Sequence, residues 1–149
     1  MSKISFELTT PERTVLAETV DQITLPTKEG EITILPNHIP LVAMLVPGMV
    51  TLVTAKQESY LAVSGGFIEV QPGSRVVVLA DTAERADELD EKKIEEARAR
   101  AQAMLTEKRQ VDDVAFADAA VGLERELARL KVARKKYRGN RAMPQNQKI

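Results

Sequence analysis

The spacing of apolar residues changes near Asp81, and this change divides the chain into two parts that must fold differently. Before Asp81, apolar and polar residues alternate, as at Ile4, Phe6 and Leu8, which is typical of a strand with one buried face. After Asp81, apolar residues recur at steps of three and four in segments rich in Ala, Glu, Lys and Arg, which indicates amphipathic helices. We therefore predict an all-β N-terminal part followed by an α-helical part.

Turn-forming pairs punctuate the N-terminal part at roughly the 8–12-residue spacing of a sandwich or barrel. They are Thr10-Pro11, Glu29-Gly30, Pro36-Asn37, Pro47-Gly48 and Pro72-Gly73. The β-branched run 75–79 is continuous, which predicts a strand buried on both faces. Gly65-Gly66 indicates either a close approach of two backbones or a bulge. We expect an antiparallel β-sandwich over residues 1–84.

The C-terminal part predicts a helical hairpin over residues 87–138, with Asp112 or Asp113 capping the second helix. The expected seam consists of Ile94, Ala97, Ala101, Met104, Leu105, Phe116, Ala120, Leu123, Leu127, Leu130 and Tyr137. Gly139-Asn140 should end the helix and leave residues 139–149 as a flexible tail. The seam is thin, so two interpretations stay open: a stably docked appendage, or a hairpin that can detach or extend.

Composition excludes several classes of site. The chain has no cysteine, and His38 is its single histidine, which excludes disulfides and cysteine-bound metals and argues against a multi-histidine zinc site. The first ten residues lack the apolar core of a signal peptide. No window reaches the roughly 18 apolar residues of a spanning helix. We expect no metal, no direct membrane insertion, and membrane association through partners alone.

Positive charge is concentrated at the C-terminal end. Residues 125–149 hold nine Lys and Arg and one acidic residue, whereas residues 1–124 hold 12 and 21. The basic side chains of the expected second helix and tail are Arg125, Arg129, Lys131, Arg134, Lys135, Lys136, Arg138 and Arg141. The helix dipole favours cations near a C-terminus, but it accounts for only some of them. Few aromatic residues argue against nucleic acid, and the thin apolar face argues against a lipid surface.

Two β blocks carry a family resemblance. Residues 23–48 contain four prolines and two glycines, with Gly-Glu, Ile-Leu-Pro-x-His-x-Pro-Leu and Pro-Gly elements in order, and residues 62–81 add Ser-Gly-Gly-Phe. Together with the charged helical tail, they resemble the epsilon subunit family of the rotary F-type ATP synthase over nearly the whole chain. The resemblance implies a non-catalytic central-stalk subunit that couples gamma to the c-ring. It also implies a peripheral location at the cytoplasmic face of a bacterial plasma membrane, although a thylakoid version would look similar.

The resemblance implies contacts of the β-sandwich with the c-ring and with gamma. The turn carrying Glu29 and Glu31 would face the c-ring, and His38, displayed between two prolines, would touch the ring as well. The alternative for His38 is a turn histidine that hydrogen-bonds its own backbone. Residues 65–70 would lie near the surface that holds gamma.

The basic helix would extend along gamma into the catalytic hexamer. By resemblance, its cations would meet an acidic helix-loop of the beta subunit and inhibit ATP hydrolysis. The residues implied are Arg125, Arg129, Lys131, Arg134, Lys135 and Lys136. A folded-down hairpin would permit turnover, and an extended one would restrain hydrolysis.

A nucleotide site is implied only in part. Some family members bind ATP through Ile/Leu-Asp-x-x-Arg-Ala, and here Leu89 and Asp90 match while Lys93 replaces the arginine. Lysine lacks the planar fork that grips phosphate. A copy five residues later restores Arg98 but replaces the aspartate with Glu95. ATP as a regulatory ligand and an ordinary charged helix both stay open, as does the rival of a free nucleotide-sensing or acidic-partner-binding module. We expect no resident cofactor and no enzyme, because no nucleophile accompanies His38 in its motif.

Overall fold

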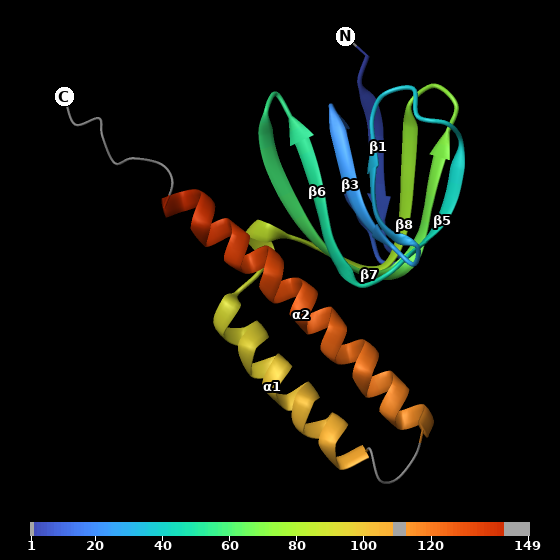
Figure 1. Ribbon diagram of the computed structural model, residues 1–149. Helices are drawn as coiled ribbons and strands as arrows, with labels where there is room; N and C mark the ends of the chain where they lie inside the picture. Colours follow the sequence, from blue (N-terminus) through green and yellow to red (C-terminus); the bar gives the residue numbers. More distant parts are fainter. Residues whose placement is uncertain (1, 109–112, 142–149) are drawn as a thin grey trace, which may run out of the picture.

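The computed structural model describes residues 2–108 and 113–141, without the side chains of residues 108 and 136–141. Figure 1 shows a β-sandwich with two antiparallel helices beside one end of it. The predicted fold class, a sandwich followed by a helical hairpin, is confirmed. The strands are β1 (Ile4–Thr9), β2 (Thr14–Val20), β3 (Gln22–Thr27), β4 (Gly30–Ile34), β5 (Leu41–Leu45), β6 (Gly48–Thr54), β7 (Gln57–Gln71) and β8 (Arg75–Arg85).

The long strands β7 and β8 join the two layers of the sandwich. The hydrogen-bonded order is β2-β1-β8-β7-β5-β3-β4, and β6 pairs with both β3 and β7. Among the described strands the pairings are antiparallel except that of β1 with β8, where Ser5 lies opposite Arg75 in parallel register. The predicted antiparallel sandwich therefore contains one parallel pair.

The core lies between the two layers and follows the alternation read from the sequence. On β1, Ile4, Phe6 and Leu8 are buried while the residues between them are not. Burial of each such side chain removes apolar surface from water and contributes about 1.5–3 kcal/mol. The run on β8 departs from the prediction, because Val76 and Val78 are buried but Leu79 is exposed. That strand has one buried face and one apolar face that stays at the surface.

The hairpin begins after η1 (Ala86–Glu88) and consists of α1 (Glu91–Lys108) and α2 (Asp113–Arg141). Asp90 caps α1, since its Oδ1 accepts hydrogen bonds from the backbone N–H groups of Lys92 at 3.0 Å and Lys93 at 3.4 Å. Helix α2 begins with Asp113 as its first helical residue, and the other predicted cap, Asp112, lies outside the described residues. The helix runs three residues past the predicted end at 138. Gly139 and Asn140 therefore lie inside the helix, and only residues 142–149 of the predicted tail remain, outside the described residues.

A second, smaller core joins the hairpin to the sandwich. It consists of Ala62, Leu89, Ile94, Leu130, Val132 and Ala133. The predicted seam was wrong at Leu127 and Met104, which are exposed, and it missed Val132 and Ala133, which are fully buried. The side chain of Tyr137 lies outside the described residues. Helix α2 contacts both α1 and the strands β6 and β7 (Figure 1), so it needs two apolar stripes. The predicted seam contained only one stripe, which is why it missed the residues that face the sandwich.

Candidate partner-binding surfaces

An apolar strip crosses three strands on the outer face of the sandwich. Strand pairing places Met44 of β5 opposite Phe67 of β7, and Phe67 opposite Leu79 of β8. Their exposed fractions are 47%, 55% and 57%, and Val42 and Ile39 at 70% and 74% extend the apolar surface toward the β4–β5 loop. Because cross-strand neighbours are only about 5 Å apart, these side chains form one continuous surface. Exposed apolar surface of this kind is typical of sites that bind a partner.

Gly65 and Gly66 make this part of β7 possible. A Cβ on Gly66 would lie 2.0 Å from the Leu79 carbonyl oxygen, and one on Gly65 would lie 2.4 Å from an Asp81 carboxylate oxygen. The predicted close approach of two backbones is therefore confirmed. The close approach of the two strands places Phe67 directly beside Leu79 of β8.

The turn between β3 and β4 carries Glu29 and Glu31, and both are exposed. Gly30 supplies a positive φ of 111°, and the Thr27 hydroxyl donates to its carbonyl at 2.5 Å. The turn is therefore well defined, with both carboxylates free to meet a partner in the solvent.

His38 lies in the loop after β4, at the opposite end of that strand from Gly30. Its backbone is held by the left-handed Asn37, whose N–H donates to the Ser74 hydroxyl at 2.8 Å. The ring Nδ1 is 2.8 Å from the carbonyl oxygen of Ile39, which is the local backbone bond of the alternative interpretation. Strand β4 separates Gly30 from Ile34 by roughly 13 Å. The structure therefore does not bring Glu29, Glu31 and His38 together.

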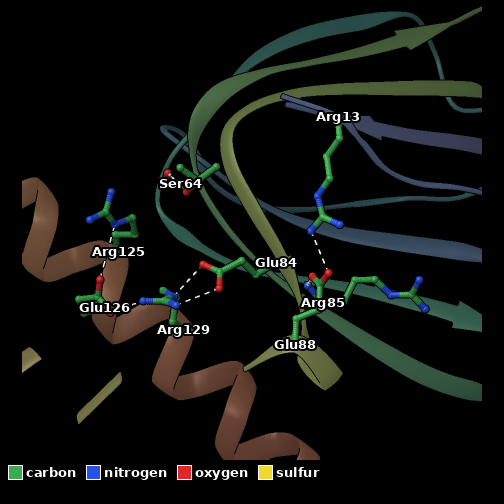
Figure 2. A network of polar contacts seen from close by, with 9 residues as sticks. Arg13, Ser64, Glu84, Arg85, Glu88, Arg125, Glu126 and Arg129 are labelled. Atoms are coloured by element: carbon green, nitrogen blue, oxygen red, sulfur yellow. Dashed lines mark hydrogen bonds and ion pairs between the residues drawn. The ribbon is translucent and has the colours of Figure 1, made fainter. Parts of the chain in front are cut away.

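Most described cations of α2 face acidic groups within the chain. Arg129 contacts Glu84 of β8 and Glu126 of its own helix (Figure 2). Arg134 lies 3.4 Å from both Glu91 and Glu95 of α1. Arg125 Nε is 3.7 Å from Glu126, and Lys135 Nζ sits 5.5 Å from the centre of the Tyr60 ring. Lys131 is exposed, and the side chain of Lys136 lies outside the described residues.

Burial works against the charge of Arg129, but the hydrogen bonds and charges of Glu84 and then Glu126 outweigh it, so its pKa lies above the usual value. The guanidinium therefore keeps its charge while partly buried. Glu126 is itself buried, so Arg129 and Glu126 form the most enclosed ion pair among the described side chains of α2.

A basic groove lies between the two helices. It has a volume of about 530 Å³ and is lined by Arg98, Leu127, Leu130, Lys131, Arg134 and Lys135. Of the residues predicted for a nucleotide, Arg98 lines it, with its Nε 2.9 Å from Glu95. Leu89 belongs to the small core, Asp90 caps α1, and Lys93 is exposed elsewhere on α1. Sequence spacing did not reveal that Arg98 meets cations of α2, since their proximity depends on helix packing.

Among the residues that the structure describes, no helix is long and apolar enough to span a membrane. Nor do these residues contain a cluster of three or more His, Asp or Glu side chains placed to hold a metal ion.

Comparison with known proteins defines the class first. Residues 3–86 match the family described as "ATP synthase, Delta/Epsilon chain, beta-sandwich domain". A chain in the cryo-EM structure of the Euglena gracilis mitochondrial ATP synthase, OSCP/F1/c-ring, superposes with a TM-score of 0.72 at 27% identity, covering 83% of this chain and 77% of that one. A chain of the Tetrahymena thermophila mitochondrial ATP synthase central stalk and c-ring shares the fold at a TM-score of 0.54 and 18% identity, covering 91% and 96%.

Sequence relatives define the family within that class. The ATP synthase epsilon chain of Chloroflexus aggregans is 47% identical over 87% of this chain and 91% of its own. That of Herpetosiphon aurantiacus is 46% identical over 93% of this chain and 98% of its own. The chain therefore belongs to the ATP synthase epsilon chain family, as its resemblance implied.

Proposed function

We propose that this chain is a non-catalytic central-stalk subunit of a proton-translocating F-type ATP synthase, which joins gamma to the c-ring and turns with them. The observation that carries the proposal is the apolar strip of Met44, Phe67 and Leu79. Covering such a strip is worth about 25 cal/mol for each Å² of apolar surface removed from water. Gamma is its proposed occupant, in keeping with the neighbouring chain from an F1/c-ring assembly.

A pull-down with purified gamma tests this proposal. The native chain should bind stoichiometrically, whereas Phe67→Ser should lose most of the binding and keep its thermal stability, since the side chain is more than half exposed. Val121→Ser, at an equally exposed apolar position on α2, is the matched control and should bind as the native chain does. Equal binding by Phe67→Ser would show that gamma does not use the strip.

The c-ring contact is proposed at Glu29 and Glu31 alone. Two exposed carboxylates on an ordered turn suit basic or amide groups on a polar loop, and they should steer docking more than tighten it. His38 is left out because it lies at the other end of β4. Glu31→Gln should slow association of the chain and gamma with purified c-ring, most visibly at low salt, and leave gamma binding unchanged.

The second part of the proposed function is inhibition of ATP hydrolysis by an extended hairpin. Its cations would meet an acidic element of the beta subunit. The proposed contacts are Arg125, Lys131, Arg134, Lys135 and Lys136. Arg129 would join them once it is released from Glu84 and Glu126. The exposure of Lys131 and the surface position of Arg134 support this role. Replacing Lys131, Arg134 and Lys135 together with Gln should raise the ATPase activity of the assembled complex, whereas no change would exclude these three cations as inhibitory contacts.

ATP is a candidate regulatory ligand of the hairpin, and one observation favours it. Four basic side chains line the groove between α1 and α2, and oxygens of a triphosphate are suitable acceptors for them. Calorimetry at millimolar ATP should give heat with the native chain and with Lys92→Gln, and little with Arg98→Gln. ATP binding by a chain that fails to bind gamma would favour the rival, a free nucleotide-sensing module.

The proposed location is peripheral, at the cytoplasmic face of a bacterial plasma membrane. The chain should sediment with membranes through its partners. Membranes stripped of the other stalk subunits should not retain it.

A further inference from the structure

The contact between β8 and α2 is centred on one arginine. Arg129 Nη2 donates to Glu84 Oε2 at 2.9 Å, and its Nε lies 2.7 Å from Glu84 Oε1 without the angle of a hydrogen bond. Its Nη1 donates to Glu126 Oε2 at 2.8 Å. Figure 2 shows Glu84 reaching from the sandwich toward Arg129, with Glu126 on the other side of the guanidinium. One cation thus bridges a carboxylate of each domain.

The apolar contact beneath this cluster is small. On the sandwich side it includes Ala62, with Met49 and Tyr60 partly buried, and on α2 it includes Leu130, Val132 and Ala133. Alanine contributes little apolar area, so hydrophobic burial alone holds the helix less firmly than it holds the main core. The orientation of α2 on the sandwich therefore depends strongly on its polar contacts.

The cluster is enclosed enough for its charges to matter. The side chain of Arg129 is 25% exposed, that of Glu84 30% and that of Glu126 7%. A partner removed from an enclosed pair leaves an uncompensated charge, which costs more than the loss of a surface pair. By contrast, Arg134 is more than half exposed and pairs within the hairpin, so its contacts do not hold the two domains together.

We propose that Glu84, Arg129 and Glu126 form an ionic latch that holds the hairpin on the sandwich and withholds Arg129 from acidic partners while it is closed. Docking and partner binding then compete for the same guanidinium. An acidic surface that captures Arg129 opens the latch, and closure removes one cation from the helix. This inference rests on the proposed inhibition for its consequence, but the latch itself is a property of the isolated chain.

The test uses the whole chain. Because the chain has no cysteine, spin labels can be attached at two introduced cysteines alone. Spin labels on Gln57→Cys in β7 and Ala103→Cys in α1, both exposed sites, report the distance between sandwich and hairpin by pulsed electron resonance. The native chain should give one narrow distribution. Glu84→Gln and Arg129→Gln should each lower the ratio of docked to undocked hairpin by about tenfold. This effect lies between that of losing an exposed ion pair and that of losing a fully buried one.

Glu7→Gln is the matched control, because it removes the Glu7–Arg75 pair, 3.7 Å long, within the sandwich alone. It should leave the distribution unchanged. High salt should open the native chain and have less effect on Glu84→Gln, since the pair it screens is already absent. Native-like distributions for both Glu84→Gln and Arg129→Gln would overturn the latch.

Activity of the assembled complex separates the latch from the proposed inhibition. Glu84→Gln frees the hairpin with all its cations and should strengthen inhibition several-fold, whereas Arg129→Gln frees it with one cation fewer and should inhibit less than Glu84→Gln. An open hairpin with unchanged ATPase activity would support the latch and count against inhibition by the helix.

Discussion

Gly66 and the carbonyl oxygen of Leu79 are so close that a Cβ on residue 66 would lie 2.0 Å from that oxygen. Gly66 also has a φ of 120°, where side chains are strained. Gly66→Ala should therefore destabilise the chain by about 3 kcal/mol or more, since strain and a backbone clash add. Urea unfolding measures this loss.

Gly73→Ala is the control for that experiment. Gly73 has a positive φ of 81° but nothing within 4 Å of its Cβ position. Its substitution should cost about 1 kcal/mol from backbone strain alone. Equal losses at the two positions would mean that the close approach at Gly66 is not decisive.

Leu130 and Leu127 lie on the same helix and differ in burial, at 2% and 47% exposed. Leu130→Ala should leave a cavity in the small core and destabilise the docked hairpin by about 2–3 kcal/mol. Leu127→Ala should change stability by less than about 0.5 kcal/mol. Amide exchange along α2 would compare them, and similar protection in both variants would contradict the packing described.

Glu88 of η1 connects the segment between sandwich and hairpin to the β1–β2 loop, which carries Arg13. Its carboxylate accepts a hydrogen bond from the Arg85 N–H at 2.8 Å and from Arg13 Nη2 at 2.8 Å, and these lower its pKa below the usual 4.5. A lowered folded pKa contributes stability that is present above pH 4.5 and is lost as pH falls through the folded value. The native chain should therefore exceed Glu88→Gln in urea midpoint at pH 7, with the gap narrowing toward pH 3. Glu124→Gln, exposed on α2, should show no such narrowing.

Asp90 caps α1 through the backbone N–H groups of Lys92 and Lys93. Asp90→Ala should cost about 1 kcal/mol and Asp90→Asn much less, because asparagine also caps. Exchange of the Lys92 and Lys93 amides should rise in the alanine variant first, since both donate to Asp90. If Asp90→Asn lost the calorimetric heat of ATP binding while the Lys92 and Lys93 amides stayed protected, Asp90 would instead be a ligand of ATP.

Some features could not be predicted from the sequence because the residues that explain them lie far apart in the chain. The turn between β6 and β7 uses Ala55 and Lys56, both with positive φ, without glycine or asparagine. Asp21 holds it by accepting the Ala55 N–H at 2.8 Å, 34 residues away. The apolar run ending at Leu79 looked like a doubly buried strand because an exposed apolar surface has the same composition as a core.

The sequence by itself determined the two domains, the helical hairpin and most turns, because these follow from local spacing of apolar residues and from glycine, proline and asparagine. It also determined the family, through motifs that occur in a characteristic order along the two β blocks. Only the tertiary structure decided which face of α2 meets the sandwich, that Glu31 and His38 lie apart, and that Arg129 meets Glu84. Those relationships depend on packing between segments distant in sequence, where periodicity carries no information about the partner.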